Sequence, residues 1–334
     1  SSGYDFNPMF SKVKEEIESA DLAAINQETI FVKSGFSGYP SFGSPKKVGD
    51  AIVDTGFDIV TCATNHVMDR GSGAVSYTWK YWKKKHPEIQ LLGIHDTAAD
   101  ARKIRIVKKN GIKIALLNYT YGLNGYSLPY AKKYLVDMLT SSNKAKIKRD
   151  IKRAKKKSDF VIVFPHWGTE YRLSADSSQK SWARFFANQG VDLVVGTHPH
   201  VVEPLKKVTG SSGNKMTCFY SLGNFVSNQR YETLSNYSRT QGEKSRLTEQ
   251  GMIGNVELTY NRKTGEITYT DISCIPTWVD RYSSGGRNVY VIIPLIEDLD
   301  ANETLTKSKH TTRAKNALTS ITKLVGEEFI YKAD

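Results

Sequence analysis

Four of the seven histidines in this sequence lie just past the ends of short runs of apolar and β-branched residues, the pattern of buried strands. They are His66 after the run at 57–61, His166 after the run at 160–164, and His198 and His200 after the run at 191–195. Ligands of open α/β sheets bind beyond the carboxyl ends of the strands. We therefore expect the four imidazoles to meet at one rim of a sheet.

A single proline separates His198 from His200. Pro199 disfavours the helical region for His198 and favours an extended backbone. Residues two apart on an extended chain point to the same side. The spacing therefore predicts that the two histidines reach a shared metal centre.

Oxygen donors accompany the histidines. A further strand is predicted at 21–26, and its last residue, Asn26, is followed by Gln27 and Glu28. The three cysteines, Cys62, Cys218 and Cys274, are widely spaced and form no C-x-x-C pair, which argues against a disulfide framework and against a thiolate zinc site. Imidazole, carboxylate and amide oxygen together suit Zn, Mn or Fe.

A metal centre of this kind can hydrolyse a phosphoester. Two ions about 3.5–4 Å apart polarise a phosphoryl oxygen and supply a hydroxide near neutral pH. A histidine that is not a ligand can then protonate the leaving group. His66 suits that role, and Asp69 is a candidate for orienting its ring.

Each of these residues also has a plainer interpretation. A single histidine after a strand is more often a hydrogen-bonded structural residue than a ligand, Asn65-His66 is also typical of a turn, and Glu28 of a surface charge. Their coincidence at four strand ends favours the metal site.

Other polar segments are less informative. His86 and His310 are expected at the surface, and His95 near the site without an assigned role. The segment 221–225 either places the amide of Asn224 at the rim or forms a tight turn. The Gly- and Ser-rich loop 34–44 either borders the site or is an ordinary surface loop.

Helical patterns alternate with these apolar runs through the first two thirds of the chain. Helices are predicted at 8–20, 46–55, 72–85, 144–157, 174–189 and 308–329, and strands at 21–26, 57–61, 90–94, 103–107, 112–118, 159–164 and 191–195. The runs at 216–221, 251–260, 266–273 and 289–295 have turn signals between them and predict an antiparallel part.

This order of elements predicts one domain over residues 1–334. Its class is α/β (α+β), a four-layer sandwich of two mixed β-sheets flanked by helices. Residues 251–334 would supply the C-terminal strands and the closing helix.

The positive charge is concentrated in one segment. The chain has 47 Lys and Arg against 34 Asp and Glu, a net charge of +13, and residues 144–157 alone hold nine basic residues and one acidic residue, a net +8. Ile147, Ile151 and Ala154 form the apolar stripe of a surface helix there. A solvated helix face is the favoured interpretation, and contact with an anionic polymer or membrane surface is the alternative. Nothing in the sequence matches a nucleic-acid-binding motif.

The segments that carry the candidate residues together resemble a known family. They are Asn26-Gln27-Glu28, Asn65-His66 with Asp69 and Gly71, and the segments 166–171, 196–201 and 220–225. In this order they resemble the bacterial capsule-synthesis family CapA, also called the poly-gamma-glutamate synthesis accessory or PGA_cap proteins. The likeness extends over about residues 4–225. The family is similar to the calcineurin-like metallophosphoesterases, whose fold is a β-sandwich flanked by helices around two metal ions.

The resemblance assigns roles to individual residues. It implies that His66 is the general acid, with Asp69 beside it. It implies metal ligands at Glu28, Asn65, His166, His198 and His200. We expect Asn26, Glu170 and Asn224 close behind these ligands. The implied cofactor is a divalent metal, two ions of Mn, Zn or Fe.

One feature of the family has no counterpart here. Its members open with a strand that ends in Gly-Asp, whose aspartate is a ligand, ahead of the segment that matches Tyr4. Gly49-Asp50 lies inside a helical pattern and is not that motif. We therefore expect the first strand, its aspartate and any membrane anchor to lie upstream of Ser1, unless the first metal position is altered.

Two functions remain in view from the sequence. One is a metal-dependent hydrolase in capsule synthesis that acts on a phosphoester. The other is a non-catalytic accessory protein that anchors or exports an anionic capsule polymer, in a membrane-bound complex outside the cytoplasm. The missing aspartate favours the accessory protein, and the Asn65-His66 pair favours the enzyme, because a scaffold needs no general acid. A nucleic-acid partner is not expected.

Overall fold

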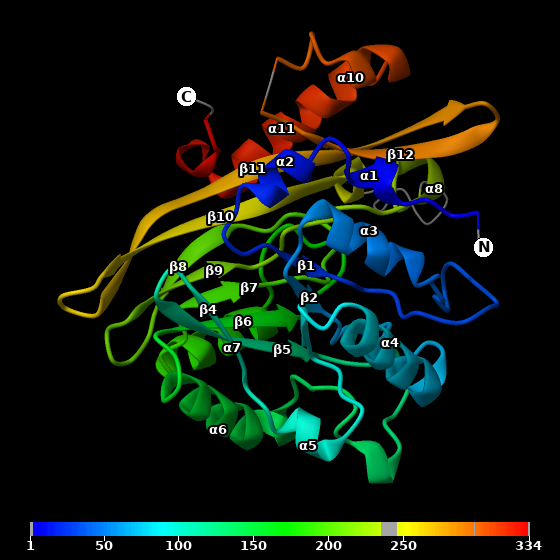
Figure 1. Cartoon of the computed structure of the whole chain (residues 1–334). Helices are drawn as coiled ribbons and strands as arrows, with labels where there is room; N and C mark the ends of the chain where they lie inside the picture. Colours follow the sequence, from blue (N-terminus) through cyan, green and yellow to red (C-terminus); the bar gives the residue numbers. More distant parts are fainter. Residues whose placement is uncertain (1–2, 235–245, 297, 333–334) are drawn as a thin grey trace.

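The structure, a computed structural model, describes residues 3–234, 246–296 and 298–332. Its largest sheet has six strands in the order β4-β5-β6-β7-β9-β8 (Figure 1). They are β4 (Arg105–Lys109), β5 (Ile112–Thr120), β6 (Phe160–His166), β7 (Leu193–Val195), β8 (Leu205–Thr209) and β9 (Lys215–Phe219). The four inner strands are parallel, and the edge strands β4 and β8 are antiparallel to their neighbours.

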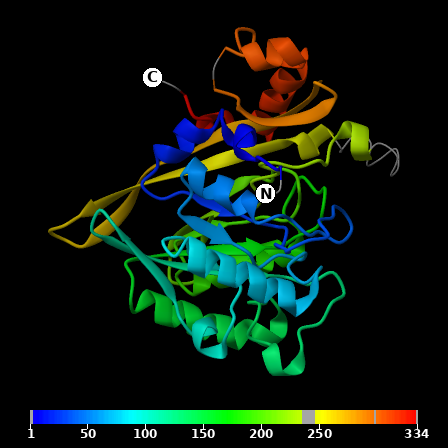
Figure 2. The same cartoon turned by 45° about the vertical axis from the view of Figure 1, so that its right-hand side comes forward.

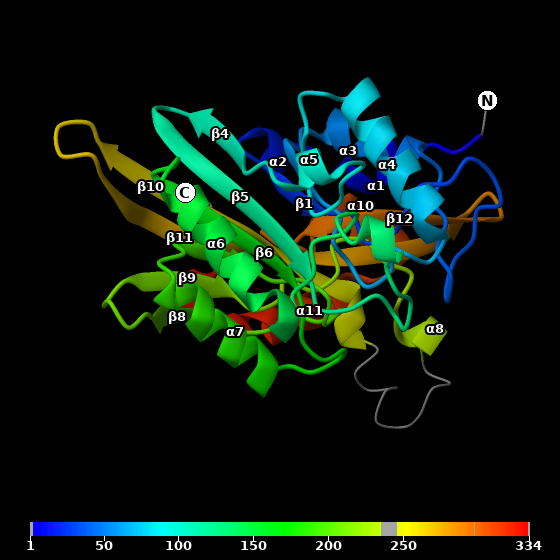
Figure 3. The same cartoon turned by 90° about the horizontal axis from the view of Figure 1, so that it is seen from below.

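Two helices cover the outer face of this sheet (Figure 3). They are α6 (Lys144–Lys155) and α7 (Ser177–Asn188), which connect β5 to β6 and β6 to β7. The stripe of Ile147, Ile151 and Ala154 is fully buried against the sheet, as the spacing predicts. In α7, the Asp176 side chain accepts a hydrogen bond from the Gln179 backbone and closes a capping box.

The opposite face of the six-stranded sheet packs against two smaller sheets. One is parallel, with β1 (Ala24–Asn26), β2 (Ile59–Thr61) and β3 (Gln90–Leu92); the other is antiparallel, with β10 (Gln250–Asn261), β11 (Glu266–Ser284) and β12 (Arg287–Pro294). Ile59 and Met252, from the two small sheets, share a core with Leu116 of β5. The described ranges thus form three sheets where two were predicted, because the second layer is divided.

Helices also cover the far side of the second layer, so the order helix–sheet–sheet–helix is confirmed (Figures 1 and 2). Over β1–β3 lie α2 (Lys14–Glu18), α3 (Lys47–Thr55) and α4 (Gly71–Lys85). The short helix α1 (Asn7–Phe10) packs between α3 and β12. Over β11 and β12 lie α10 (Glu303–Ser308) and α11 (Thr311–Val325). Shorter helices are α5 (Ala98–Ala101), α8 (Tyr231–Leu234), η1 (Tyr130–Lys132), η2 (Ser141–Asn143), η3 (Arg246–Glu249) and η4 (Glu327–Phe329).

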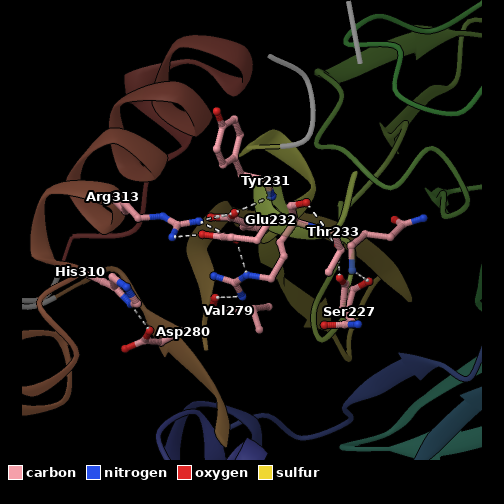
Figure 4. Close-up of polar contacts among 12 residues, drawn as sticks. Ser227, Tyr231, Glu232, Thr233, Val279, Asp280, His310 and Arg313 are labelled. Carbon is pink, nitrogen blue, oxygen red and sulfur yellow. Dashed lines mark hydrogen bonds and ion pairs between the residues drawn. The ribbon is translucent and has the colours of Figure 1, made fainter. Parts of the chain in front are cut away.

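Polar contacts tie α11 and the residue before it to α8 and to β11 (Figure 4). Arg313 Nη1 donates to Glu232 Oε1 over 2.6 Å, and Arg230 Nε donates to Glu232 Oε2 over 2.9 Å. Arg230 is only 1% exposed, so Glu232 compensates a buried charge. His310 Nδ1 lies 2.7 Å from Asp280 Oδ1 of β11.

Several predicted elements differ in detail. The helix expected at 8–20 is broken into α1 and α2, because the backbone N–H groups of Ser11 and Val13 donate to the carbonyls three residues back, of Pro8 and Phe10, and not four. The strand expected at 216–221 is β9, which pairs antiparallel to β8 but parallel to β7 and so belongs to the large sheet and not to the antiparallel sheet. The lysine-bearing edge strand β8 was not predicted, because its residues 205–209 lack a clear alternation. No described helix combines the length and the apolarity needed to span a bilayer.

Candidate metal centre

The carboxyl ends of β1, β2, β6 and β7 carry the candidate ligands to one place. β1 and β2 are parallel and in register at Asn26 and Thr61, and β6 and β7 are parallel neighbours in the large sheet. Two groups of side chains come close enough to share an ion, each offering one ligand atom per residue, with these atoms within 4.8 Å of one another. The first group is Glu28, His166 and His198, and the second is Glu170, His198 and His200. His198 therefore joins two groups of three that could each hold an ion.

A bridging asparagine aligns the two strand ends on which the site depends. Asn118 of β5 accepts a hydrogen bond from the Ala63 backbone and donates one to the Phe164 carbonyl, both over 2.8 Å. Gly93 passes close behind it: a Cβ there would lie 2.1 Å from Asn118 Oδ1, and its φ is +83°. Asn118 thus fixes β2 relative to β6, although a single polar residue in a strand gave no signal in the sequence.

His198 and His200 approach each other through a backbone that was not predicted. Their φ values are 104° and 61°, so both lie in the left-handed region and the expected extended conformation is wrong. Proline disfavours a right-handed helix for the preceding residue, and this does not exclude the left-handed side. Non-glycine residues there are strained, and such strain gathers at functional sites. The two ring centroids are 5.9 Å apart.

Burial keeps the central imidazoles neutral. It lowers the pKa of His198 to about 3 and that of His166 well below the ordinary value, and neighbouring histidines add to both effects. Neutral imidazole is the form that binds metal. Moreover, His198 Nδ1 is buried without a hydrogen-bond partner among the described residues, which is costly unless something else satisfies it. The donors present therefore fit a divalent metal of the Zn, Mn or Fe type.

Asn65 belongs to the same cluster. Its Oδ1 lies 2.8 Å from His166 Nε2. Two ligands that each lie about 2.1 Å from one ion at a right angle would be separated by about 3 Å. The pair is therefore spaced as two ligands of a common ion would be. Thr197 Oγ1, 2.9 Å from His166 Nδ1, holds the other side of that ring.

His66 and Asp69 form a separate pair beside the cluster. His66 Nδ1 lies 2.7 Å from Asp69 Oδ2, and the side chains are 8% and 2% exposed. Burial alone would lower the pKa of His66, but the hydrogen bond and charge of Asp69 outweigh it and raise the pKa above its ordinary value. His66 belongs to neither group of three, which leaves its ring available for proton transfer.

The loop 34–44 borders the site, one of the two alternatives left open by the sequence. The Phe42 backbone donates to Asp69 Oδ2 over 2.9 Å, and the Phe42 ring packs edge-on against His66 with centroids 4.7 Å apart. On the other side, the Tyr121 ring lies 4.6 Å from that of His198. Phe42 and Tyr121 thus flank the centre, and neither had a recognisable signal in the sequence.

The three residues expected close behind the ligands behave differently. Asn224 Oδ1 lies 3.0 Å from His200 Nδ1 and orients that ring. Glu170 comes into the cluster itself, with Oε1 3.9 Å from His200 Nε2. Asn26 instead accepts a hydrogen bond from Thr61 across the β1–β2 pair.

The remaining histidines lie elsewhere. His95 is buried between Asp100 and Asp137, at 3.2 and 2.7 Å, and does not reach the centre. His86 and His310 were expected at the surface, but their side chains are only 14% and 23% exposed, since each packs beside a carboxylate.

Comparison with known proteins places this site in context. The family described as bacterial capsule synthesis protein PGA_cap matches residues 1–229. The PGA biosynthesis protein CapA of Bacillus subtilis (strain 168) is 36% identical over 177 residues, 53% of this chain and 44% of that protein. The capsule biosynthesis protein CapA of Bacillus anthracis is 31% identical over 183 residues, 54% of this chain and 42% of that protein. The matches thus span less than half of either relative.

Two solved structures are also similar in part. A hypothetical protein from Thermus thermophilus aligns with a TM-score of 0.42 and 12% identity, over 86% of this chain and 91% of its own. A protein provisionally described as a 5′-nucleotidase from Staphylococcus aureus aligns with a TM-score of 0.40 and 13% identity, over 81% of this chain and 43% of its own.

Proposed function

Because the chain belongs to the bacterial capsule synthesis protein PGA_cap family, we propose that it is a metal-dependent phosphoesterase-type hydrolase of capsule or poly-gamma-glutamate synthesis. The observation that carries the proposal is the neutral, buried histidine cluster beside the His66–Asp69 pair. A cluster of metal donors alone would suit a structural ion. A protonatable histidine held at its edge by a buried carboxylate is what leaving-group protonation requires.

The residues divide into holding and proton-transfer roles. Glu28, Asn65, His166, Glu170, His198 and His200 would hold a pair of divalent ions. Bound there, the ions supply a Lewis acid for a phosphoryl oxygen and a water that ionises near neutral pH. His66 gives its proton to the departing oxygen, and Asp69 stabilises the charged ring before the transfer. Phe42 limits the access of water to that pair.

The test measures metal content and turnover on the same protein. The chain, loaded with Mn or Zn, is assayed on generic phosphomonoesters and phosphodiesters. We expect His66→Ala to lower kcat by about 10²- to 10⁴-fold with metal content unchanged. We expect His198→Ala to lose metal as well. His86→Ala is the control, because His86 pairs with Asp50 and Glu88 away from the site.

Two results would contradict the hydrolase. One is a chain that binds no metal; the other is a metal-loaded chain whose turnover is unaffected by His66→Ala. Absence of turnover on every ester by a metal-loaded chain would favour the accessory protein.

One observation supports the second candidate, a non-catalytic protein that binds an anionic capsule polymer. Lys144, Lys148, Lys152 and Lys156 are exposed at intervals of four along α6 and its C-cap. In the part of the chain that the structure describes, the ion pairs of α6 join other basic residues to Asp137 and Asp150. Like charges four residues apart destabilise a helix, and a bound polyanion would offset the repulsion among these four lysines.

Charge reversal tests this second candidate. Lys148→Glu with Lys152→Glu should weaken binding to poly-gamma-glutamate, and the loss should be greatest at low salt. Arg262→Glu with Lys263→Glu makes the same charge change on the exposed β10–β11 turn and serves as the control. Equal binding by the two double variants would leave α6 as solvated surface. A place at the cell envelope, and in a membrane-bound synthesis complex, is part of this proposal.

A further inference from the structure

Asn124 contacts two residues of the candidate centre from a loop that follows β5. Its Oδ1 accepts a hydrogen bond from Asn65 Nδ2 over 3.0 Å. Its Nδ2 lies 3.3 and 3.4 Å from the two ring nitrogens of His66. The backbone of Asn124 is left-handed, with φ 49°, a region that asparagine tolerates better than most residues. The loop therefore presents this side chain to Asn65 from a conformation suited to asparagine.

The contact decides which end of the Asn65 amide faces the histidines. An amide has one acceptor end and one end with two donors, and only the oxygen can ligate a metal. Asn124 Oδ1 can only accept, so it selects the Nδ2 end of Asn65. Tyr121, three residues earlier, also hydrogen-bonds the Asn65 side chain. With its nitrogen held by this loop, Asn65 turns Oδ1 toward His166.

We propose that Asn124 is a positioning residue that fixes the Asn65 amide with its oxygen toward the metal centre and thereby sets the affinity for metal. This inference rests on the metal site of the proposed function but not on any reaction there. Without Asn124, the Asn65 amide can rotate or flip, and the centre loses one oriented oxygen. Outer partners of metal ligands typically contribute about 10- to 100-fold to affinity.

The test is calorimetric titration of the intact chain with Zn or Mn, with melting temperature as a check on folding. We expect Asn124→Ala to weaken binding by about 10-fold or more. Asn124→Asp keeps the acceptor for Asn65 and should retain most of the affinity. Asn124→Gly removes the acceptor but accepts the left-handed backbone, so it should weaken binding as alanine does.

A double variant separates positioning from general damage. In the Asn65→Ala background, Asn124→Ala should weaken binding no further, because the group it positions is gone. The inference is overturned if Asn124→Ala binds metal like the wild type, if only the alanine variant and not the glycine variant is weakened, or if the effect persists without Asn65. A wild-type chain that binds no metal overturns both this inference and the proposed function. A wild-type chain that binds metal but turns over no ester overturns only the hydrolase.

Discussion

Glu203 is a buried carboxyl whose replacement should make the protein more stable at neutral and alkaline pH. It is fully buried three residues after His200, and its Oε2 accepts a hydrogen bond from Gln179 Nε2 over 2.6 Å. Oε1 is buried without a hydrogen-bond partner among the described residues. Burial raises the pKa of Glu203 from 4.5 to about 7; Gln179 opposes this, and the charge of Asp176 adds to it.

The size of the effect on stability follows from the difference between the pKa of Glu203 in the folded and in the unfolded protein. The folded protein keeps a proton on Glu203 that the unfolded chain releases above pH 4.5, so stability falls as pH rises from there to about 7. At about 1.4 kcal/mol for each pH unit, the loss is about 3 kcal/mol and is complete above pH 7. Glu203→Gln stays neutral at every pH and keeps an acceptor for Gln179. Its free energy of unfolding should therefore exceed that of the wild type by an amount that grows with pH.

Urea unfolding followed by tryptophan fluorescence, from about pH 5 to about pH 9, measures this difference. The unpaired position at Oε1 gives glutamine a cost of its own, so the change of the difference with pH is the quantity to read. Glu266→Gln, at an exposed glutamate, is the matched control and should show no such change. A wild-type-to-variant difference that stays constant over this range, or that shrinks with pH, would refute the reasoning.

Three further changes test other parts of the structure. Gly93→Ala should cost about 2–4 kcal/mol of unfolding free energy by thermal or urea denaturation, because the new Cβ would meet Asn118 Oδ1 at 2.1 Å in a left-handed backbone; full stability would contradict the bridge. Glu232→Ala should cost about 3 kcal/mol in urea unfolding, because it strips the buried Arg230 of its carboxylate, whereas a loss under about 0.5 kcal/mol would mean that the pair is solvated. Burial lowers the pKa of His95, but two aspartates outweigh it and raise that pKa above 6.5. The free energy of unfolding of the wild type should exceed that of His95→Gln by its full amount below pH 6.5, and this excess should fall as pH rises through the raised pKa. An excess that does not change with pH would exclude a charged His95.

The strand-end histidines could be predicted because parallel strands bring their carboxyl ends to a common edge. His166 and His198 needed only the apolar runs before them to be placed correctly. The geometry of His198 itself could not be predicted in this way, because the proline rule excludes one backbone region and leaves two. Asn118 and Asn124 were missed for a different reason. Each acts through one side chain that contacts residues more than forty positions away, and no local spacing reports such a contact.

The layers of the fold likewise depend partly on local sequence patterns, which can be predicted, and partly on long-range packing, which cannot. The stripe of Ile147 and Ile151 fixes α6 by its own periodicity, so it was predicted with its buried face. The division of the second layer into two sheets depends on how β1–β3 and β10–β12 meet the large sheet. Ile59 and Met252 share one core there although almost two hundred residues separate them. Burial of this kind follows from the topology and not from either segment alone.

The C-terminal sheet has a direct bearing on the candidate metal centre, although the family match ends at residue 229. Asn224, which orients His200, donates through Nδ2 to the Thr248 carbonyl over 2.9 Å. The neighbouring backbone continues this contact, since Gly223 bridges Gly251 at the start of β10. His200 therefore takes its orientation from a residue that β10 holds in place. It follows that the orientation of the histidine cluster depends on contacts with a sheet that lies beyond the matched region.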